Sequence, residues 1–433
     1  KRLGIMAGGS AENYGTILVQ GQGSSGPEGK KSYVMVNGTM TGNSLTVPEE
    51  CFLDKNNASY FATPVADACF EITYSNGEKI LAKTVDNVNS STTQVKLLKD
   101  VVKSYWMISS VANNFVLDLN GKTLSGAEDS TYYVLYAGAS MTIKNGTIKY
   151  NSTGKGAICA YGGETLVIES DVIIDGGSGV GVMMQNNAPT VVLNGTVTTT
   201  GAYGFTSNGS ANEDGKPDTC NITVNEGATI SAPRGFAIYH PTLGTVTING
   251  GTIGGHTGIE LCAGKLIVIG GTITSTGDNA DATGSQNAIP DGAAISIINR
   301  NYPGGVPTAE IRGGKITAAG SGALALKIYD YTNNAVAEWT DAGESINVSG
   351  GRFSSEVKSE YCAAGYEPIH YSDGSYGVTV KTTPVIPVIS GGTSAVSVPK
   401  ADNGKVTVNP PAAKEGETVT ITVTPDAGYE LGS

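Results

Sequence analysis

Long hydrophobic runs are missing from this 433-residue sequence, so no membrane-spanning helix is predicted. Charge is also sparse, because Asp, Glu, Lys and Arg together make up only 15% of the chain. The 39 acidic residues outnumber the 27 basic ones and leave a net charge of −12 at pH 7. Nucleic-acid-binding surfaces are basic, so we expect no nucleic-acid partner and no membrane insertion in this chain.

Histidine and cysteine are scarce as well. The three histidines, His240, His256 and His370, leave little scope for a general base or a transition-metal site. The six cysteines form no CxxC motif and no Cys/His cluster, which argues against a zinc site and against a dense disulfide framework. We expect most of them to be buried apolar fillers. Cys51 and Cys69 are close enough in sequence to pair, but their spacing leaves the question open.

Glycine is abundant, with 60 residues, and it marks an internal repeat. A phrase of alternating apolar residues, a small-residue turn and a further β-branched residue recurs from residue 116 onward. Clear copies are Val116–Leu124, Met141–Ile148, Val191–Val197, Val246–Ile253 and Leu266–Ile273. The turn glycines Gly121 and Gly146 are 25 residues apart, and Gly251 and Gly271 are 20 apart, which indicates one repeat per turn of a solenoid.

A second short strand is predicted between the phrases, at residues 156–160, 181–184, 235–239 and 258–262, and helical periodicity is almost absent. We therefore predict an all-β chain, a parallel β-helix over about residues 95–380 with two or three strands per coil. Ile143, Ile248 and Val268 would fill its interior, Asn145 and Asn249 would form polar ladders at the turns, and the turn glycines would supply positive φ angles.

The ends of such a solenoid need caps. Leu81, Val85 and Val88 have helical spacing, so we predict a short N-terminal cap helix at residues 81–88. Residues 350–378 read as a last coil closed by a hairpin. The predicted organisation is a small N-terminal β module of unknown type at 1–79, the capped β-helix at 80–380, a linker at 381–400 and a truncated repeat module at 401–433.

Two stretches carry a family resemblance. The sequence from Val95 to Gly126 resembles the opening of right-handed parallel β-helix domains in adhesin-like cell-surface proteins of Gram-positive, often gut-dwelling bacteria, and residues 350–378 are similar to the end of those domains. The tail from Gly404 to Leu431 resembles the start of a bacterial surface repeat module. The resemblance implies a right-handed β-helix in an exported, extracellular, cell-wall-attached protein, and Lys1 without a signal segment reads as the start of an excised fragment.

Catalytic residues are not evident. Glycoside hydrolysis needs two carboxyl groups on neighbouring coils, but aligning the second strands places Glu260 opposite Ala237 and Ser296, with no partner carboxylate. We therefore expect no enzymatic activity. The alternative is a carbohydrate-active β-helix enzyme, either a polysaccharide lyase or a glycoside hydrolase, with a diverged site.

Two inserted loops contain oxygen ligands of the kind that calcium prefers, namely residues 212–218 and residues 278–281 with Asp291. Neither loop has the spacing of an EF-hand, so we expect ordinary polar loops, no metal site and no cofactor.

The remaining candidate is a binding surface. If Phe236, Ile238, Ile259 and Leu261 point inward, the alternate positions and the following turns point outward along one side of the rod. Tyrosine and arginine on rigid strands favour binding, and the chain has 20 tyrosines against 7 phenylalanines. The predicted binding row is Tyr161, Gln185, Tyr239, His240, Arg300, Asn301, Tyr302, Tyr329, Asp330 and Tyr331.

The function hypothesis is a monomeric, adhesin-like binding protein. Its ligand would be a host glycan such as mucin or a host secreted protein such as immunoglobulin, with a spacer role without a ligand as a further reading. Plain structural cover of the sheet is the competing interpretation of the row.

Overall fold

The computed structural model describes residues 59–185, 189–210, 215–280, 290–333, 335–381, 394–398, 401, 403–414 and 416–429, and strands within residues 4–56. In that N-terminal part, a four-stranded sheet has the order β1-β4-β8-β7, and two further pairs are β2-β5 and β3-β6. The bounds are β1 Gly4–Gly8, β2 Ala11–Asn13, β3 Ile17–Leu18, β4 Tyr33–Asn37, β5 Met40–Gly42, β6 Leu45–Thr46, β7 Cys51–Asn56 and β8 Ser59–Pro64.

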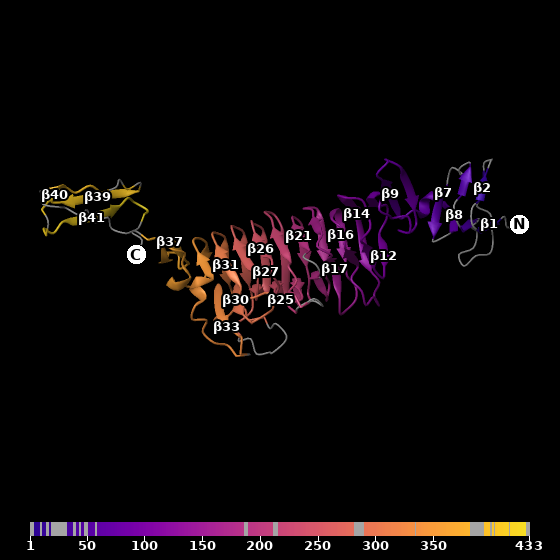
Figure 1. Cartoon of the computed structure of the whole chain (residues 1–433). Helices are drawn as coiled ribbons and strands as arrows, with labels where there is room; N and C mark the ends of the chain where they lie inside the picture. Colours follow the sequence, from indigo (N-terminus) through magenta and orange to yellow (C-terminus); the bar gives the residue numbers. More distant parts are fainter. Residues whose placement is uncertain are drawn as a thin grey trace.

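The central part is a rod of stacked coils, each with three short strands (Figure 1). Equivalent strands of successive coils pair in parallel and form three rows along the rod. Row A contains β11 (Thr92–Leu97), the first halves of β14 (Phe115–Gly126) and β16 (Met141–Lys149), β18 (Thr165–Ile168), β21 (Thr190–Leu193), β24 (Asn221–Val224), β26 (Thr245–Ile248), β28 (Lys265–Val268), β31 (Thr308–Ile311) and β34 (Ile346–Val348).

Row B contains β12 (Val101–Lys103), the second halves of β14 and β16, β19 (Val172–Asp175), β22 (Thr196–Thr198), the first halves of β25 (Thr229–His240) and β27 (Thr252–Leu261), β29 (Thr272–Ser275), β32 (Lys315–Ala318) and β35 (Arg352–Phe353). Row C contains β13 (Trp106–Ile108), β15 (Leu135–Ala137), β17 (Gly156–Tyr161), β20 (Val180–Gln185), β23 (Tyr203–Ser207), the second halves of β25 and β27, β30 (Ile295–Asn299) and β33 (Leu326–Asp330). The predicted all-β, parallel β-helix is confirmed.

The interior of the rod follows from the alternation of apolar residues along each strand. Ile143, Ile248 and Val268, which the sequence assigned to the interior, are all fully buried. Ile248 and Val268 are in direct register on neighbouring coils. Burying one such side chain stabilises the fold by about 1.5–3 kcal/mol, and the repetition of this contact along the rod supplies most of the driving force.

The turns between rows A and B carry the predicted polar residues. The Asn249 side-chain amide donates to the Oδ1 of Asn225 at 2.9 Å, and Asn225 donates in turn to the Oδ1 of Asn194 at 2.8 Å. Asn145 donates to an aspartate, the Oδ1 of Asp118, at 3.1 Å. The predicted ladder is therefore confirmed at Asn249, whereas Asn145 pairs with a carboxylate.

The N-terminal cap differs from the prediction, because residues 81–88 form no helix. Strand β10 (Lys79–Ala82) extends into this segment and pairs antiparallel with β9 (Phe70–Tyr74), which pairs antiparallel with β11 and so covers the first coil. Val85 and Val88 follow in a turn, where the Val88 amide donates to the Val85 carbonyl, and both side chains pack on the core. A hairpin and a turn therefore take the place of the predicted cap helix.

The C-terminal end is closed as predicted. Strand β37 (Tyr376–Val380) pairs antiparallel with β35 and with β36 (Tyr366–His370), so a hairpin covers the last coil. Single 3₁₀ turns occur at Val65–Asp67, Ala342–Glu344 and Ser359–Tyr361. Among the described residues, no helix is long and apolar enough to cross a membrane.

The tail contains two small antiparallel pairs. Strand β39 (Gly404–Asn409) pairs with β41 (Thr420–Pro425), and β38 (Ser394–Ala395) pairs with β40 (Ala412–Ala413). Most of the predicted linker, residues 382–393 and 399–400, lies outside the described residues.

Two features of the turn at Gly251 require glycine, namely its positive φ angle and the close approach of backbone. Gly251 has φ +81°, and a Cβ there would lie 2.6 Å from the Ala228 carbonyl oxygen, whereas Gly227 has φ +82° with open space around it. Either substitution to Ala costs about 1–2 kcal/mol of left-handed strain. We expect Gly251→Ala to lose about 1–3 kcal/mol more than Gly227→Ala, because the added methyl meets backbone. Equal losses in urea unfolding of the full chain would contradict this account.

Candidate functional site

The register of row C decides where the predicted binding row lies. Tyr239, Glu260, Ser296 and Lys327 are in register on β25, β27, β30 and β33 and lie on the outer face of row C. The next residue in each strand therefore faces the interior. His240 is in register with Leu261, a member of the main core, and its side chain is fully buried. The prediction that His240 points outward is wrong.

Several predicted residues do meet, but in a buried cluster. We define the outer aromatic cluster as the residues that pack together on the outer face of row C: Phe236, Tyr239, Cys262, Ile298, Tyr329 and Tyr331, with Tyr203 and Tyr302 half-buried against them. Tyr302 and Tyr331 follow β30 and β33 in the chain and contact this face. Phe236 belongs to this cluster, so its predicted inward orientation is also wrong.

One hydrogen bond links two tyrosines of the cluster, and Arg300 makes a cation–π contact with a third. The hydroxyl groups of Tyr239 and Tyr302 are 3.0 Å apart, and the Arg300 guanidinium lies 4.9 Å from the ring centre of Tyr331. Tyr239, Tyr329 and Tyr331 are each more than nine-tenths buried. These residues are thus brought together as predicted, but as packed cover of the sheet and not as an exposed row.

Four other predicted residues, Tyr161, Gln185, Asn301 and Asp330, are not members of this cluster. Tyr161 and Gln185 are half-buried and in register on β17 and β20. Asn301 is exposed with φ 56°, and Asp330 accepts a hydrogen bond from the Asn299 amide at 2.9 Å.

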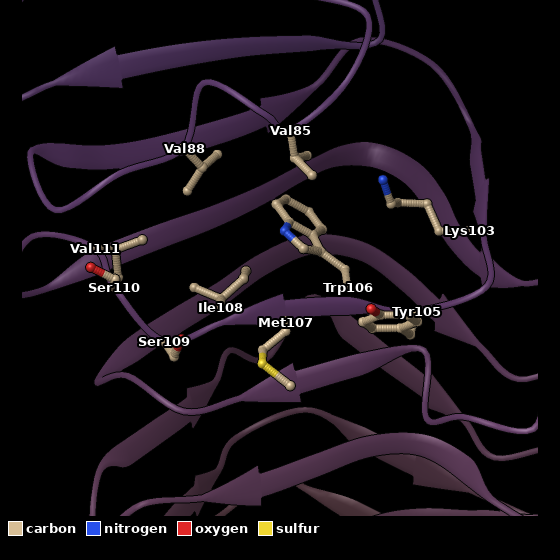
Figure 2. A pocket seen from close by; sticks show the side chains of 10 residues that line it. All are labelled: Val85, Val88, Lys103, Tyr105, Trp106, Met107, Ile108, Ser109, Ser110 and Val111. Carbon is tan, nitrogen blue, oxygen red and sulfur yellow. The ribbon is translucent and has the colours of Figure 1, made fainter. Parts of the chain in front are cut away.

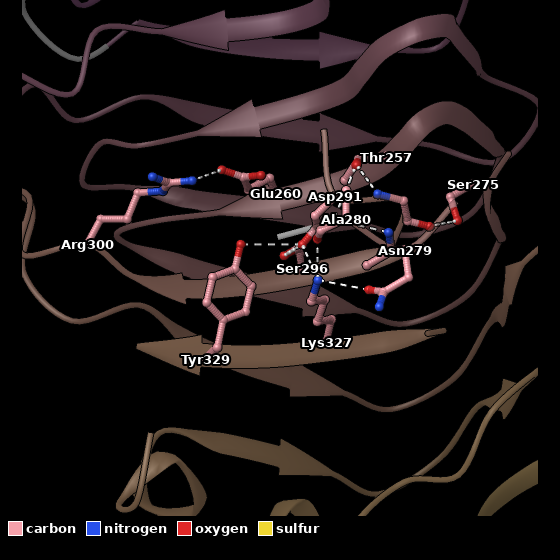
Figure 3. Close-up of polar contacts among 12 residues, drawn as sticks. Thr257, Glu260, Ser275, Asn279, Ala280, Asp291, Ser296, Arg300, Lys327 and Tyr329 are labelled. Carbon is pink, nitrogen blue, oxygen red and sulfur yellow. Dashed lines mark hydrogen bonds and ion pairs between the residues drawn. The ribbon is translucent and has the colours of Figure 1, made fainter. Parts of the chain in front are cut away.

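Beside the cluster lies Glu260, a fully buried carboxylic acid (Figure 3). Its Oε1 pairs with the Arg300 guanidinium at 3.2 Å, and its Oε2 has no hydrogen-bond partner among the described residues. Burial raises the pKa of Glu260 to about 8, although the charge of Arg300 acts in the opposite direction.

A second buried carboxylate, Asp291, lies close to Glu260. It follows the inserted loop after β29, and its Oδ2 accepts a hydrogen bond from Ser296 at 2.6 Å and lies 4.0 Å from the Lys327 ammonium group. Ser296 is the register neighbour of Glu260. No carboxylate is in register with Glu260, as the strand alignment predicted, but a loop that no strand alignment includes brings Asp291 close enough for its charge to act on Glu260.

The strand alignment itself was also shifted. Tyr239, not Ala237, is in register with Glu260, because β25 bulges between Ala232 and Phe236. A bulge inserts residues into one strand only, so counting along the sequence misplaces every later position in that strand. Both Glu260 and Asp291 are fully buried, and Lys327 also donates to Asn279 at 2.9 Å. This polar group holds the inserted loop against row C.

The cysteines and the two inserted loops are only partly described. Cys159, Cys220 and Cys262 are buried free thiols, as predicted, and Cys69 is a free thiol too. Residues 211–214 and 281–289 of the two loops lie outside the described residues. Elsewhere in the described chain, no three His, Cys, Asp or Glu side chains are grouped to hold a metal ion.

The first coils, in contrast, present an open outer face. We define the tyrosine patch as Tyr105, Met107, Tyr132 and Tyr136. Tyr105, Met107 and Tyr132 are 46%, 52% and 50% exposed, and Tyr136 is half-buried. Met107 and Tyr136 are register neighbours at the start of the same outer ladder that later carries Tyr239 and Glu260.

Ring contacts organise the tyrosine patch. The ring centres of Tyr105 and Tyr132 are 5.0 Å apart, and Tyr105 meets Tyr136 edge to face at 6.2 Å. The prediction started the row at Tyr161 and missed these residues. The sequence signal was present as two adjacent aromatic pairs, Tyr105-Trp106 and Tyr132-Tyr133, in the first two coils.

A cavity of about 350 Å³ adjoins the patch (Figure 2). Tyr105 and Met107 belong to its lining together with Trp106, and the cap residues Val85 and Val88 form another side. Its polar side chains are Lys103, Ser109 and Ser110, and Lys103 is the only charged one. Burial lowers the pKa of Lys103, while the charge of Asp86 acts in the opposite direction.

The buried histidine gives a pH test. Burial lowers the pKa of His240 to about 4, whereas an exposed histidine titrates near 6.5. Between these values the unfolded chain binds more protons, so stability falls as the pH is lowered from 6.5 towards 4, by up to about 3 kcal/mol. His240→Leu should remove this loss, since Leu261 occupies the same position one coil later.

The measurement is urea unfolding of wild type and His240→Leu at pH 7 and pH 4.5. Contributions from carboxylates are common to both proteins and cancel in the comparison. An equal loss of stability in the two proteins would show that His240 is not the group responsible.

Comparison with known proteins bears on the tail of the chain. Residues 394–433 match the family described as the divergent InlB B-repeat domain, a bacterial surface-type module. No curated protein and no solved structure matches the chain. The chain therefore combines a β-helix with a C-terminal module of the kind found in bacterial surface proteins.

Proposed function

We propose that this chain is the binding region of a bacterial surface protein and that it recognises host carbohydrate, such as mucin glycans, through the tyrosine patch. The exposure of Tyr105 and Tyr132 is the observation that supports this most directly. Their rings are large and rigid and are not covered, while Tyr239 and Tyr329 farther along the rod are buried. Aromatic rings offer a flat apolar face with a polar edge, which suits the CH-lined faces of sugar rings.

The position of the patch fits an adhesin-like role. It lies on the first coils, at β13 and β15 and just before them, whereas the chain continues from β37 at the other end of the β-helix towards the repeat module (Figure 1). In a protein attached to the cell wall through C-terminal modules, this end of the rod would face outward. The protein would then act as a monomeric, extracellular rod, without a cofactor.

A host protein such as immunoglobulin is the second candidate ligand. Stable protein interfaces bury about 800 Å² on each partner, with a central group of anchors. The tyrosine patch offers two exposed rings and one methionine beside a cavity of about 350 Å³, which favours a small, ring-shaped ligand. The enzyme alternative is disfavoured because Glu260 and Asp291 expose no surface to a polysaccharide.

Substitution of the exposed rings tests this function. We expect the double variant Tyr105→Ala, Tyr132→Ala to lose at least about tenfold in affinity for immobilised mucin O-glycans, since clustered aromatic anchors commonly contribute that much. Tyr429→Ala is the matched control, because Tyr429 is 55% exposed but belongs to the C-terminal module. Thermal unfolding of each variant checks that the fold is intact.

Unchanged glycan affinity in the folded double variant would contradict the proposal. Wild-type protein that ignores glycans and binds secreted immunoglobulin would instead favour the host-protein alternative.

The absence of catalysis is tested separately. Incubation of the full chain with pectin, xylan and mucin glycans, with and without calcium, should release no new reducing ends and no unsaturated products, because Glu260 and Asp291 are buried. Turnover that Glu260→Gln abolishes would contradict this expectation and support the enzyme alternative.

A further inference from the structure

The cavity beside the tyrosine patch contains a cation that makes no ion pair with a described residue, although the charge of Asp86 acts on it from outside the lining. Lys103 ends β12, and its half-buried side chain lines the cavity between Val85 and Tyr105 (Figure 2). No hydrogen bond or ion pair joins its ammonium group to another described residue, whereas Lys327, Lys265 and Lys79 all have carboxylate partners. The lining contains no carboxylate.

A partly buried, unpaired ammonium group is unfavourable, because burial removes water that is not replaced. Burial depresses the pKa of Lys103 for this reason. An anionic group placed in the cavity would supply the missing interaction. The protein as a whole carries −12 charges and repels anions, so recognition of an anion here depends on this local cation.

The rest of the lining indicates the body of the ligand. Tyr105 offers an exposed aromatic ring, and Trp106, which is almost fully buried, forms part of the wall. Ser109 and Ser110 are exposed hydroxyl-bearing residues of the lining, separated from these rings by Met107 and Ile108 (Figure 2). This pairing of ring faces with hydroxyl groups suits a ligand with CH faces and hydroxyl edges. The volume of about 350 Å³ lies at the small end of ligand sites, which fits a single sugar residue and its neighbour.

We infer that this cavity binds a carboxylated sugar residue at the end of a host glycan, with the carboxylate at the ammonium group of Lys103 and the sugar ring against Tyr105. The inference rests on the proposed function and adds to it a preference for glycans that end in an acidic sugar. The tyrosine patch would hold the neutral part of the glycan, and Lys103 would select chains that end in an acidic sugar.

The test is titration calorimetry of the full chain with defined oligosaccharides. The probes are 3′-sialyllactose, its carboxylate methyl ester, lactose, lactose 3′-sulfate and a disaccharide ending in glucuronic acid. We expect 3′-sialyllactose or the glucuronic acid disaccharide to bind at least tenfold more tightly than lactose, and the two probes distinguish the source of the carboxylate. The methyl ester should bind no better than lactose.

Lys103→Gln should remove the preference for the acidic sugar while affinity for lactose stays the same. Lys315→Gln is the matched control, because Lys315 is an exposed lysine on row B away from the cavity. The chain has two tryptophans, Trp106 and Trp339. In a Trp339→Phe variant, the fluorescence of Trp106 therefore reports binding in the cavity by a signal that is independent of the calorimetry.

Each contrary outcome overturns a distinct statement. Equal binding of the methyl ester and 3′-sialyllactose, or an unaltered preference in Lys103→Gln, would overturn the carboxylate site. Equal binding of lactose 3′-sulfate would replace it by a general anion site. If mucin-glycan binding still depends on Tyr105 and Tyr132 in either case, the proposed function stands and only this inference fails. If the wild type binds no glycan, both fail.

Discussion

In-register hydrogen bonding between successive coils is the constraint on which the rest of this structure depends. Every strand of rows A, B and C pairs in parallel with its equivalent in the next coil, so a residue position is repeated along the whole rod. Apolar residues at inward positions then stack on one another, as Ile248 does on Val268. Because the pairing also fixes each outward position, side chains far apart in sequence form straight ladders on the surface.

One outward ladder of row C explains both candidate sites. It begins with Met107 and Tyr136 on the first coils and continues to Tyr239, Glu260 and Lys327 on the later ones. The strand geometry is the same along the whole ladder, but the chain segments that cover the ladder differ between its two ends. The first coils remain open beside a cavity, whereas returning loops cover the later coils. Accessibility, and not the strand register, therefore separates a binding surface from a buried polar core.

The buried polar groups on the later coils have a structural consequence. Removing a carboxylate from water is costly unless it is paired, and here Glu260 pairs with Arg300 while Asp291 accepts hydrogen bonds from Ser296 and its neighbours. Disrupting one partner would leave a buried charge unmatched. The loop carrying Asp291 is consequently held in one position against row C, and the aromatic residues around it complete the cover.

The sequence by itself determined the β-helix, because a repeat near 20–25 residues with alternating apolar positions and Gly/Asn turns is compatible with few other architectures. It also determined the inward residues such as Ile143, the Asn249 ladder and the closing hairpin. The tertiary structure alone decided three things. A bulge in β25 shifted Tyr239 opposite Glu260, a hairpin and not a helix capped the first coil, and loops covered Tyr329 while leaving Tyr105 exposed. Local patterns specify which face a strand presents, but whether that face meets water depends on chain segments distant in sequence.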